Sequence, residues 1–451
     1  MRILARLGLA MSLAVPLLAQ GAPPTTLKDL AGRVEPSRLS RTVDRLASFG
    51  TRHTFSEMLS EKRGIGVASR WLGSEFQSLT RIGGSRLVAF DDVFPAEPGP
   101  LVAKPVRLVN LGVMLPGTDP AREKEALVVV AHYDSRASNV MDGEADAPGA
   151  VDNASGVALV LEMATVLATE RPAISIYFVA TAAGEQGSLG SARLVKRLKG
   201  EGVDIVGMVA ADCVGNTLNP GGTKSNTAMR IFSDGVPAQE TDGQRRVREM
   251  LGNENDGPSR ELAKYLKRSG ERYVEGLDCL AMLRRDRVGR VGEQAAFSQE
   301  GFPAVRVTEM TDNYDRQHQN VRSESGHGFG DTATFFDTGY CAKITRMMVT
   351  AFTELAYAPQ QPQNIGLGGC GTADAKLWWT LPPDPRITGI VIYRRRADGV
   401  KWEATAGFPK QESLVLPGVG TDNDVFAVAT VDAQGNESLP VSPRSITFQN
   451  P

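Results

Sequence analysis

Three apolar, β-branched runs of the sequence each lead into a short polar segment. The runs are 126–131, 174–181 and 205–211. They predict buried parallel strands, and the carboxyl ends of such strands meet at one edge of a sheet. His132, Glu185 and Asp212 follow these runs. Asp152 lies in a loop after the first. One imidazole and several carboxylates in one place are suitable ligands for a hydrolytic zinc centre.

The spacing around His132 and Asp152 indicates how each residue would act. One residue separates His132 from Asp134 at a predicted strand end, so both side chains point to the same face. His132 can then bind a metal ion while Asp134 orients it. Asp152 precedes a predicted helix, whose exposed backbone N–H groups favour a carboxylate, and its two oxygens can bridge two ions. The His-x-Asp pair is a weak signal alone, but its combination with Gly-Glu-Gln-Gly at 184–187 is far more specific.

These motifs together resemble the M28 family of zinc aminopeptidases and carboxypeptidases. The resemblance covers roughly residues 38–358. It implies an enzyme that removes residues from peptide termini at a centre of two zinc ions. The implied roles are His132 and Asp212 on one zinc ion, Glu185 and His318 on the other, Asp152 as the bridge, and Asp134 as the residue that orients His132.

The role of His318 is implied by the segment 313–322, Asn-Tyr-Asp-Arg-Gln-His-Gln-Asn-Val-Arg. This segment resembles the Tyr…His-Gln segment of the bacterial branch of the family, which has a C-terminal fibronectin type III-like module. The chain has only four histidines. His327, in a glycine-rich stretch, is the alternative ligand, and His53 is expected to be structural or exposed.

One position in the motif departs from the family. The family pattern is Glu-Glu-x-Gly-Leu-x-Gly-Ser, in which the first glutamate is the general base and the second binds metal. Aligning the glycines places Glu185 at the metal-binding position and Gly184 at the base position. A glycine cannot transfer a proton, and loss of general-base help costs about 10²–10⁴-fold in rate. A shift by one residue would make Glu185 the base and Gln186 the ligand, but it would break the glycine alignment.

A second departure lies in the expected substrate cleft. Relatives usually carry Asp-His where this chain has Glu293-Gln294, so an imidazole is replaced. Ser188 replaces the leucine of the motif, which is a milder change. Two changes in one cleft beside a complete ligand set suggest a metal-binding relative with impaired or altered catalysis.

Three functions are compatible with these residues. The leading interpretation is an exported zinc-dependent exopeptidase. The alternative is a catalytically inactive M28-like pseudoenzyme that binds zinc and a peptide or protein partner. A serine hydrolase that uses 186–190 as a nucleophile elbow is disfavoured because the first glycine of Gly-x-Ser-x-Gly is missing.

Composition and the N-terminus indicate where the protein acts. A formal net charge of −2 argues against nucleic acid as a partner. Residues 1–22 have two arginines, an apolar core and a small-residue end, which predict a cleavable signal peptide and a periplasmic or secreted protein. No later stretch of about 18 apolar residues is found, so no membrane span is expected. The pairing of Cys213, Cys279, Cys341 and Cys370 is left open, with disulfides and buried thiols as alternatives.

Alternating strands and helices predict the elements that position these residues. The fold class is α/β, with a mostly parallel central sheet flanked by helices as in zinc exopeptidases, followed by a small all-β sandwich. The expected helices include 37–49, 64–79, 153–167, 243–251 and 332–356. The expected organisation is a signal peptide (1–22), an M28-like domain (23–358) with an insertion at about 216–270, a linker (359–364) and a fibronectin type III-like sandwich (365–451).

Overall fold

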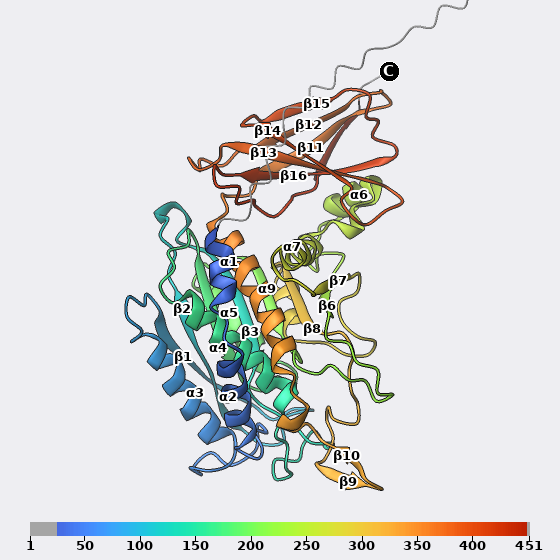
Figure 1. Ribbon diagram of the computed structural model, residues 1–451. Coiled ribbons are helices and arrows are strands. Elements are labelled where there is room, and N and C mark those ends of the chain that lie inside the picture. Colours follow the sequence, from blue (N-terminus) through green and yellow to red (C-terminus); the bar gives the residue numbers. More distant parts are fainter. Residues whose placement is uncertain (1–24, 449–451) are drawn as a thin grey trace, which may run out of the picture.

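An eight-stranded mixed sheet forms the centre of the computed structural model, which describes residues 25–448 (Figure 1). The strand order is β1-β2-β4-β3-β5-β8-β6-β7. The bounds are β1 Val88–Ala96, β2 Val106–Leu115, β3 Glu125–His132, β4 Ser175–Thr181, β5 Asp204–Ala211, β6 Ala228–Ser233, β7 Asp278–Met282 and β8 Ala304–Glu309. The four middle strands run parallel, while β2 and β6 run antiparallel to their inner neighbours. The predicted signal peptide, 1–22, lies outside the described residues.

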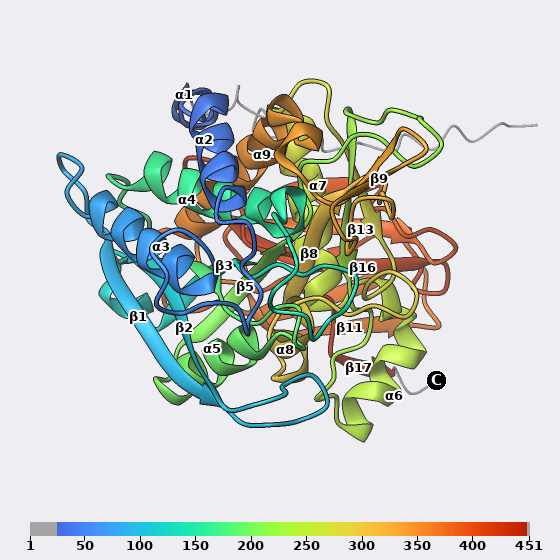
Figure 2. The same cartoon turned by 90° about the horizontal axis from the view of Figure 1, so that it is seen from below.

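Helices cover both faces of this sheet. Side chains of β3 alternate between the two cores, with Leu127, Val129 and Ala131 in one and Val128 and Val130 in the other. The first core is closed by α1 Thr25–Gly32, α2 Pro36–Ala47, α3 Ile65–Leu79, α4 Ser155–Leu167, α7 Pro258–Tyr273 and α9 Thr338–Tyr357, and the second by α5 Leu189–Gly200 and α8 Gln294–Gln299. Figure 2 shows this arrangement from the end opposite the C-terminal sandwich. Burial on both faces explains why the three runs of the sequence are largely apolar.

Three of the expected elements have a different role or a different first residue in the structure. The segment 216–270, expected to be an insertion, supplies β6 and α7 to the central sheet and its helical cover, as well as α6 Asp242–Leu251. The closing helix begins at Thr338 rather than at 332, because the side chain of Asp337 accepts a hydrogen bond from the Tyr340 N–H and caps it there. The first strand of the sandwich begins at Gln363, inside the expected linker.

Seven strands in two sheets form the C-terminal part of the described chain. They are β11 Gln363–Cys370, β12 Ala375–Thr380, β13 Gly389–Arg396, β14 Ala404–Pro409, β15 Ser413–Leu416, β16 Asp424–Val431 and β17 Ser445–Phe448. The sheets have the orders β15-β12-β11-β17 and β14-β13-β16. Leu367 and Trp379 of one sheet share a core with Ile392 and Phe426 of the other. This sandwich lies at the opposite end of the molecule from the hairpin of β9 Arg322–Glu324 and β10 His327–Phe329 (Figure 1).

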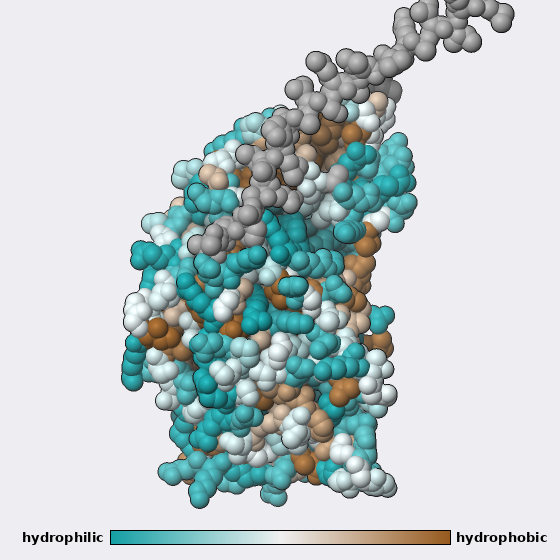
Figure 3. Space-filling model, in the orientation of Figure 1, coloured by the Kyte–Doolittle hydropathy of each residue, from teal (hydrophilic) through white to brown (hydrophobic). Residues whose placement is uncertain are grey.

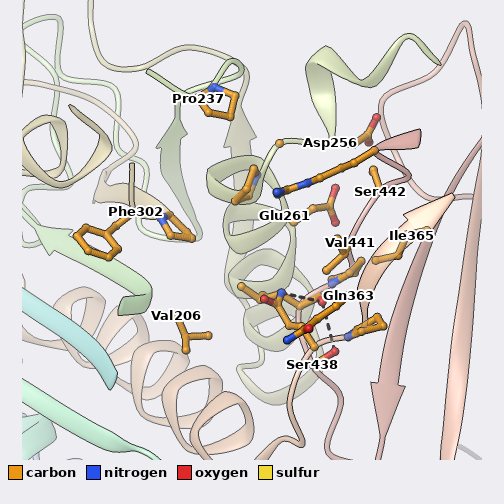
Figure 4. A pocket seen from close by; sticks show the side chains of 18 of the residues that line it. Val206, Pro237, Asp256, Glu261, Phe302, Gln363, Ile365, Ser438, Val441 and Ser442 are labelled. Atoms are coloured by element: carbon orange, nitrogen blue, oxygen red, sulfur yellow. Dashed lines mark hydrogen bonds between the residues drawn. The ribbon is translucent and has the colours of Figure 1, made fainter. Parts of the chain in front are cut away.

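A cavity of about 820 Å³ lies between the sandwich and the α/β domain. Figure 4 shows Val206 and Phe302 on the domain side and Ile365 and Ser438 on the sandwich side. None of its lining residues belongs to the pocket of the predicted zinc ligands. The sandwich is therefore attached away from the predicted chemistry.

Two further expectations concern membranes and disulfides. Contrary to the sequence analysis, the segment Ala150–Leu167 is long and apolar enough to cross a membrane, but 94% of it is buried within the protein, as expected for a core helix. All four cysteines are free thiols, and three of them are buried. The buried-thiol alternative therefore describes this structure.

Candidate metal centre

The first group of ligand atoms lies at the carboxyl ends of β3 and β5. His132 is the last residue of β3, and Asp212 directly follows β5. The Nε2 atom of His132 lies 3.4 Å from Oδ1 of Asp152 and 3.9 Å from Oδ1 of Asp212. All three residues are buried. Their ligand atoms are close enough together to bind one metal ion.

The second group shares Asp152 with the first. Glu185 lies in the loop after β4, and His318 precedes the β9–β10 hairpin. The Nε2 atom of His318 lies 3.0 Å from Oε1 of Glu185 and 3.0 Å from Oδ2 of Asp152. The two oxygens of Asp152 thus face different histidines. This is the arrangement of a carboxylate that bridges two ions.

Asp134 holds both groups in place. Its carboxylate accepts hydrogen bonds from the backbone N–H groups of Gly184 (2.8 Å) and Glu185 (3.0 Å). The Nδ1 atom of His132 lies 3.6 Å from Oδ1 of Asp134 and 3.2 Å from its carbonyl oxygen. Asp134 therefore directs Nε2 of His132 toward the centre and fixes the loop that carries Glu185.

Asp331, which no sequence pattern marks, supports the loop of Asp152. The buried carboxylate of Asp331 accepts hydrogen bonds from the backbone N–H groups of Val151 (2.9 Å) and Asp152 (2.7 Å). Burial raises the pKa of Asp331 to about 6. The fully buried Arg52 supports the same loop by donating to the carbonyl oxygens of Tyr133 (2.7 Å) and Gly149 (2.9 Å). No local pattern marks either residue, because each acts on a loop far away in the sequence.

The other histidines lie outside the two groups. His327 is exposed, and its Nε2 atom lies 3.1 Å from Oδ2 of Asp315. His53 is buried, and its Nε2 atom lies 2.9 Å from the Val140 carbonyl oxygen. The structure therefore brings His318, and not His327, to the centre.

Gly184 is in contact with a metal ligand. A Cβ atom added at this position would lie 2.3 Å from Cγ and 2.4 Å from Cβ of His132. Any side chain there would displace the imidazole or the loop. Gln186, the ligand of the shifted alignment, is buried and bonds Thr54 and the Val140 carbonyl oxygen instead of joining the ligand atoms.

Glu293 and Gln294 point in different directions. Glu293 lines the pocket of the metal groups, and its Oε1 atom accepts hydrogen bonds from the hydroxyls of Thr181 and Ser191. Its buried Oε2 atom has no hydrogen-bond partner among the described residues, and burial raises the pKa of Glu293. Gln294 donates to the carbonyl oxygen of Arg285 (3.1 Å) and is absent from the pocket lining. The structure thus places Gln294 outside the pocket lining, with its side chain under the neighbouring loop, so its place in a substrate cleft stays a prediction.

The electrostatics of the two histidines fit cation binding. Burial opposes protonation of His132, but Asp134 and Asp152 overcome this effect and raise its pKa well above the ordinary value. Burial likewise opposes protonation of His318, whereas Glu185 and Asp152 raise its pKa to about 9. The cluster of carboxylates therefore favours positive charge at both positions. Imidazole nitrogens and carboxylate oxygens are ordinary zinc ligands, so the donor set fits two zinc ions.

Ser188 lacks the neighbours of a catalytic serine. It lines the same pocket in a left-handed conformation, with φ of 57°. No hydrogen bond joins its hydroxyl to a histidine in the described part of the chain. A serine nucleophile needs such a base, so the site does not support the serine hydrolase alternative.

Two groups of histidine and carboxylate side chains that share Asp152, at the strand ends of a mixed α/β sheet, are typical of metal-dependent hydrolases. Residues 110–349 match the model of peptidase family M28. A probable zinc metalloprotease of Leptosphaeria maculans is 31% identical over 94% of this chain and 98% of its own. Another probable zinc metalloprotease, from Pyricularia oryzae, is 34% identical over 93% of this chain and 85% of its own. The chain belongs to peptidase family M28.

Solved structures show the same fold. The LapA aminopeptidase of Legionella pneumophila superposes with a TM-score of 0.52 and 19% identity, covering 74% of this chain and 75% of LapA. LapB from the same organism also gives a TM-score of 0.52, covering 75% of this chain and 78% of LapB. At this identity the likeness concerns the fold alone. It supports the α/β architecture with a large central sheet flanked by helices.

Proposed function

We propose that the protein is an exported zinc-dependent exopeptidase with an aminopeptidase-like fold and two zinc ions in its active site. The observation that carries this proposal is the pair of ligand groups that share Asp152, in a chain of family M28. They line a pocket of about 290 Å³, which matches the size of one or two amino-acid residues. When bound, the two ions would polarise the scissile carbonyl and activate the attacking water.

The chain's own residues prepare the site for this reaction. Asp134 orients His132 and the loop of Glu185, and Asp331 holds the backbone at Asp152. The position that carries the general base in the family is Gly184, so proton transfer is expected to be slow, by about 10²–10⁴-fold. Of the carboxylates that line the pocket, Glu293 is the one outside the two ligand groups.

The alternative proposal is a catalytically inactive relative that binds zinc and a peptide or protein partner. The close contact of Gly184 with His132 favours it, because the site has no room for a side chain at the base position. A complete ligand set without turnover is the expected property of such a protein. Zinc content and turnover, measured on the same sample, therefore distinguish the two proposals.

The proposal includes the location and the C-terminal module. The signal-like composition of residues 1–22 supports export to the periplasm or the medium. Seven strands in sheets of four and three support a fibronectin type III-like assignment of the sandwich. Membership of the bacterial branch is supported by the segment that carries His318.

The test is hydrolysis of aminoacyl-anilides and N-acetyl dipeptides by the purified chain from residue 23 onward. We expect slow hydrolysis that a chelator abolishes, that zinc restores and that a serine-directed phosphonate leaves unchanged. Two bound zinc ions without turnover on any substrate would instead support the inactive relative. Failure to bind zinc would refute both proposals.

A Gly184→Glu variant adds the missing carboxylate. We expect it to lose zinc rather than to gain activity, because its Cβ atom would collide with His132. Gly243→Glu, on the exposed helix α6, is the matched control, since a Cβ atom there approaches only the Thr241 hydroxyl at 4.0 Å. A large gain in rate for Gly184→Glu would show that the loop can move to accept a base.

A further inference from the structure

Four arginines line the pocket of the metal groups. They are Arg136, Arg287, Arg290 and Arg306. Two of them are neutralised within the protein. The guanidinium of Arg306 lies 3.1 Å from carboxylate oxygens of Asp212 and Asp286. Arg287 pairs with Asp286 (3.2 Å) and Asp312 (2.7 Å). These two arginines therefore stabilise the site and its wall.

The other two have no carboxylate partner among residues 25–448. The half-buried Arg136 donates only to two neighbouring backbone carbonyls, at 3.3 and 3.5 Å. The half-buried Arg290 donates to Oε1 of Gln317 at 2.9 Å and lies 4.9 Å from the ring centre of Tyr314. Both guanidinium groups keep donors available to a ligand, because each has five N–H groups.

Gln317 connects Arg290 to the metal centre. Its Nε2 atom donates to Oδ2 of Asp152 at 2.8 Å, while its Oε1 atom accepts from Arg290. Arg290 therefore lies two hydrogen bonds from the bridging carboxylate. A group bound by Arg290 would lie close to the scissile bond.

The pocket offers no comparable site for a cation. Asp152, Glu185 and Asp212 belong to the metal groups. Glu293 accepts hydrogen bonds from two hydroxyls, and its other oxygen is buried. Among the residues that line the pocket, the charged groups left available to a ligand are therefore Arg136 and Arg290.

We propose that Arg136 and Arg290 bind a carboxylate of the substrate, so that the enzyme cleaves at the C-terminal end of peptides. Arg–carboxylate hydrogen bonds are short, strong and directional. Val291, which lines the pocket with 64% of its surface exposed, offers an apolar contact to the last residue. In the reaction, the hydroxyl of water joins the acyl carbon, the C–N bond breaks, and the proton of water goes to the amine of the released amino acid.

This inference rests on the proposed function for its chemistry, but binding tests it independently. The probe is acetyl-Ala-(N-methyl)Ala, whose methylated amide resists cleavage, titrated calorimetrically into the zinc-loaded protein. Its C-terminal amide is the comparison. We expect the acid to bind about 10- to 100-fold more tightly, as for a charged hydrogen-bonded pair. Equal affinity of acid and amide would overturn the inference.

Substitution of each arginine tests whether these two residues cause the preference for the acid over the amide. We expect Arg290→Ala and Arg136→Ala each to weaken binding of the acid about tenfold or more, with affinity for the amide and zinc content unchanged. Arg284→Ala is the control, because Arg284 is exposed in the same loop and lies outside the pocket. Equal weakening of acid and amide would indicate a structural role and would refute the inference.

Turnover measurements distinguish failure of this inference from failure of the proposed function. Preferential cleavage of acetyl-Ala-Ala over alanine anilide is expected. Preference for the anilide would support the peptidase but overturn carboxylate recognition. Selective binding of the acid without cleavage would support carboxylate recognition but contradict the peptidase function. Tight binding of acetyl-Ala-Asp-amide would show that an acidic side chain, and not the terminal carboxylate, is the group recognised, and would overturn cleavage at the C-terminal end.

Discussion

Single residues decide how this site differs from the family pattern. Gly184 stands where the family has its general base, and its missing side chain leaves room for the imidazole of His132. Glu293 is the pocket carboxylate that remains outside the two ligand groups. Its buried Oε2 atom has no hydrogen-bond partner among the described residues, and burial raises its pKa, as is common for carboxylates that take part in proton transfer. Residual proton transfer is therefore expected to depend on Glu293.

Glu293→Gln tests this dependence. The amide oxygen of glutamine can still accept hydrogen bonds from Thr181 and Ser191, so a purely structural role predicts no loss of activity. We expect kcat to fall by about 10²–10⁴-fold, with zinc content and Tm unchanged, because the amide cannot take a proton. The measurement is kcat on the best peptide substrate beside zinc analysis of the same sample. An unchanged kcat would assign Glu293 a structural role only.

Elements of secondary structure position the site through their ends. β3, β4 and β5 run parallel, so the loops after them converge, and Asp134 joins two of these loops. The sandwich is attached at the other end, where Arg395 of β13 reaches Asp256 before α7. Both side chains of this pair are almost fully buried. Its loss would leave a buried charge without a partner.

Asp256→Ala is therefore expected to destabilise the protein by about 3–5 kcal/mol, as for one partner of a buried ion pair. Lys264, whose Nζ atom lies 2.7 Å from the same carboxylate, would lose a partner as well. The measurement is urea-induced unfolding followed by circular dichroism. Asp398→Ala is the control, because its ion pair with Arg396 is exposed. Equal stability of the two variants would contradict the role assigned to the buried pair.

Charged side chains are unevenly distributed over the molecule as a whole. The face in Figure 3 is mainly hydrophilic, with apolar residues in small scattered groups. The net charge is only −2, but carboxylates are concentrated at the metal groups and arginines around them. In the metal-free protein these carboxylates favour protonated histidines, so protons and zinc compete for the same atoms.

This competition predicts a pH dependence. The pKa of His318 is about 9 in the folded metal-free protein, against an ordinary value of 6.5. Because the folded value is raised, the protonated histidine contributes stability that is complete below about pH 6.5 and is lost as pH rises through 9. We expect the Tm of chelator-treated protein to fall across this range, while zinc affinity increases.

Scanning calorimetry from pH 6 to 9.5, with and without zinc, measures both trends. His318→Gln is expected to reduce the pH dependence of the metal-free protein, whereas His327→Gln, at an exposed position, leaves it unchanged. A Tm of the metal-free protein that rises between pH 6.5 and 9 would contradict the assignment of the raised pKa.

Much of the fold follows from local patterns in the sequence. The runs at 126–131, 174–181 and 205–211 form β3, β4 and β5 because strands buried on both faces are largely apolar. The segment 216–270 was harder to interpret, since β6 lies toward the sheet's edge in a polar, glycine-rich region. Its pairing with β8 depends on contacts more than 70 residues away in the sequence.

The types of the metal-binding residues and their places at strand ends can be predicted from local sequence patterns. Only the folded chain shows which histidine completes the second group, that Asp331 and Arg52 hold the Asp152 loop, and that Gln294 turns away. It also shows that Arg136 and Arg290 have no carboxylate partner in the described part of the chain. The two kinds of feature differ in how far apart in the sequence the interacting residues lie. Hydrophobic periodicity and strand-end spacing are local and can be read along the chain. Hydrogen bonds and charge pairs within a site join residues that only folding brings together.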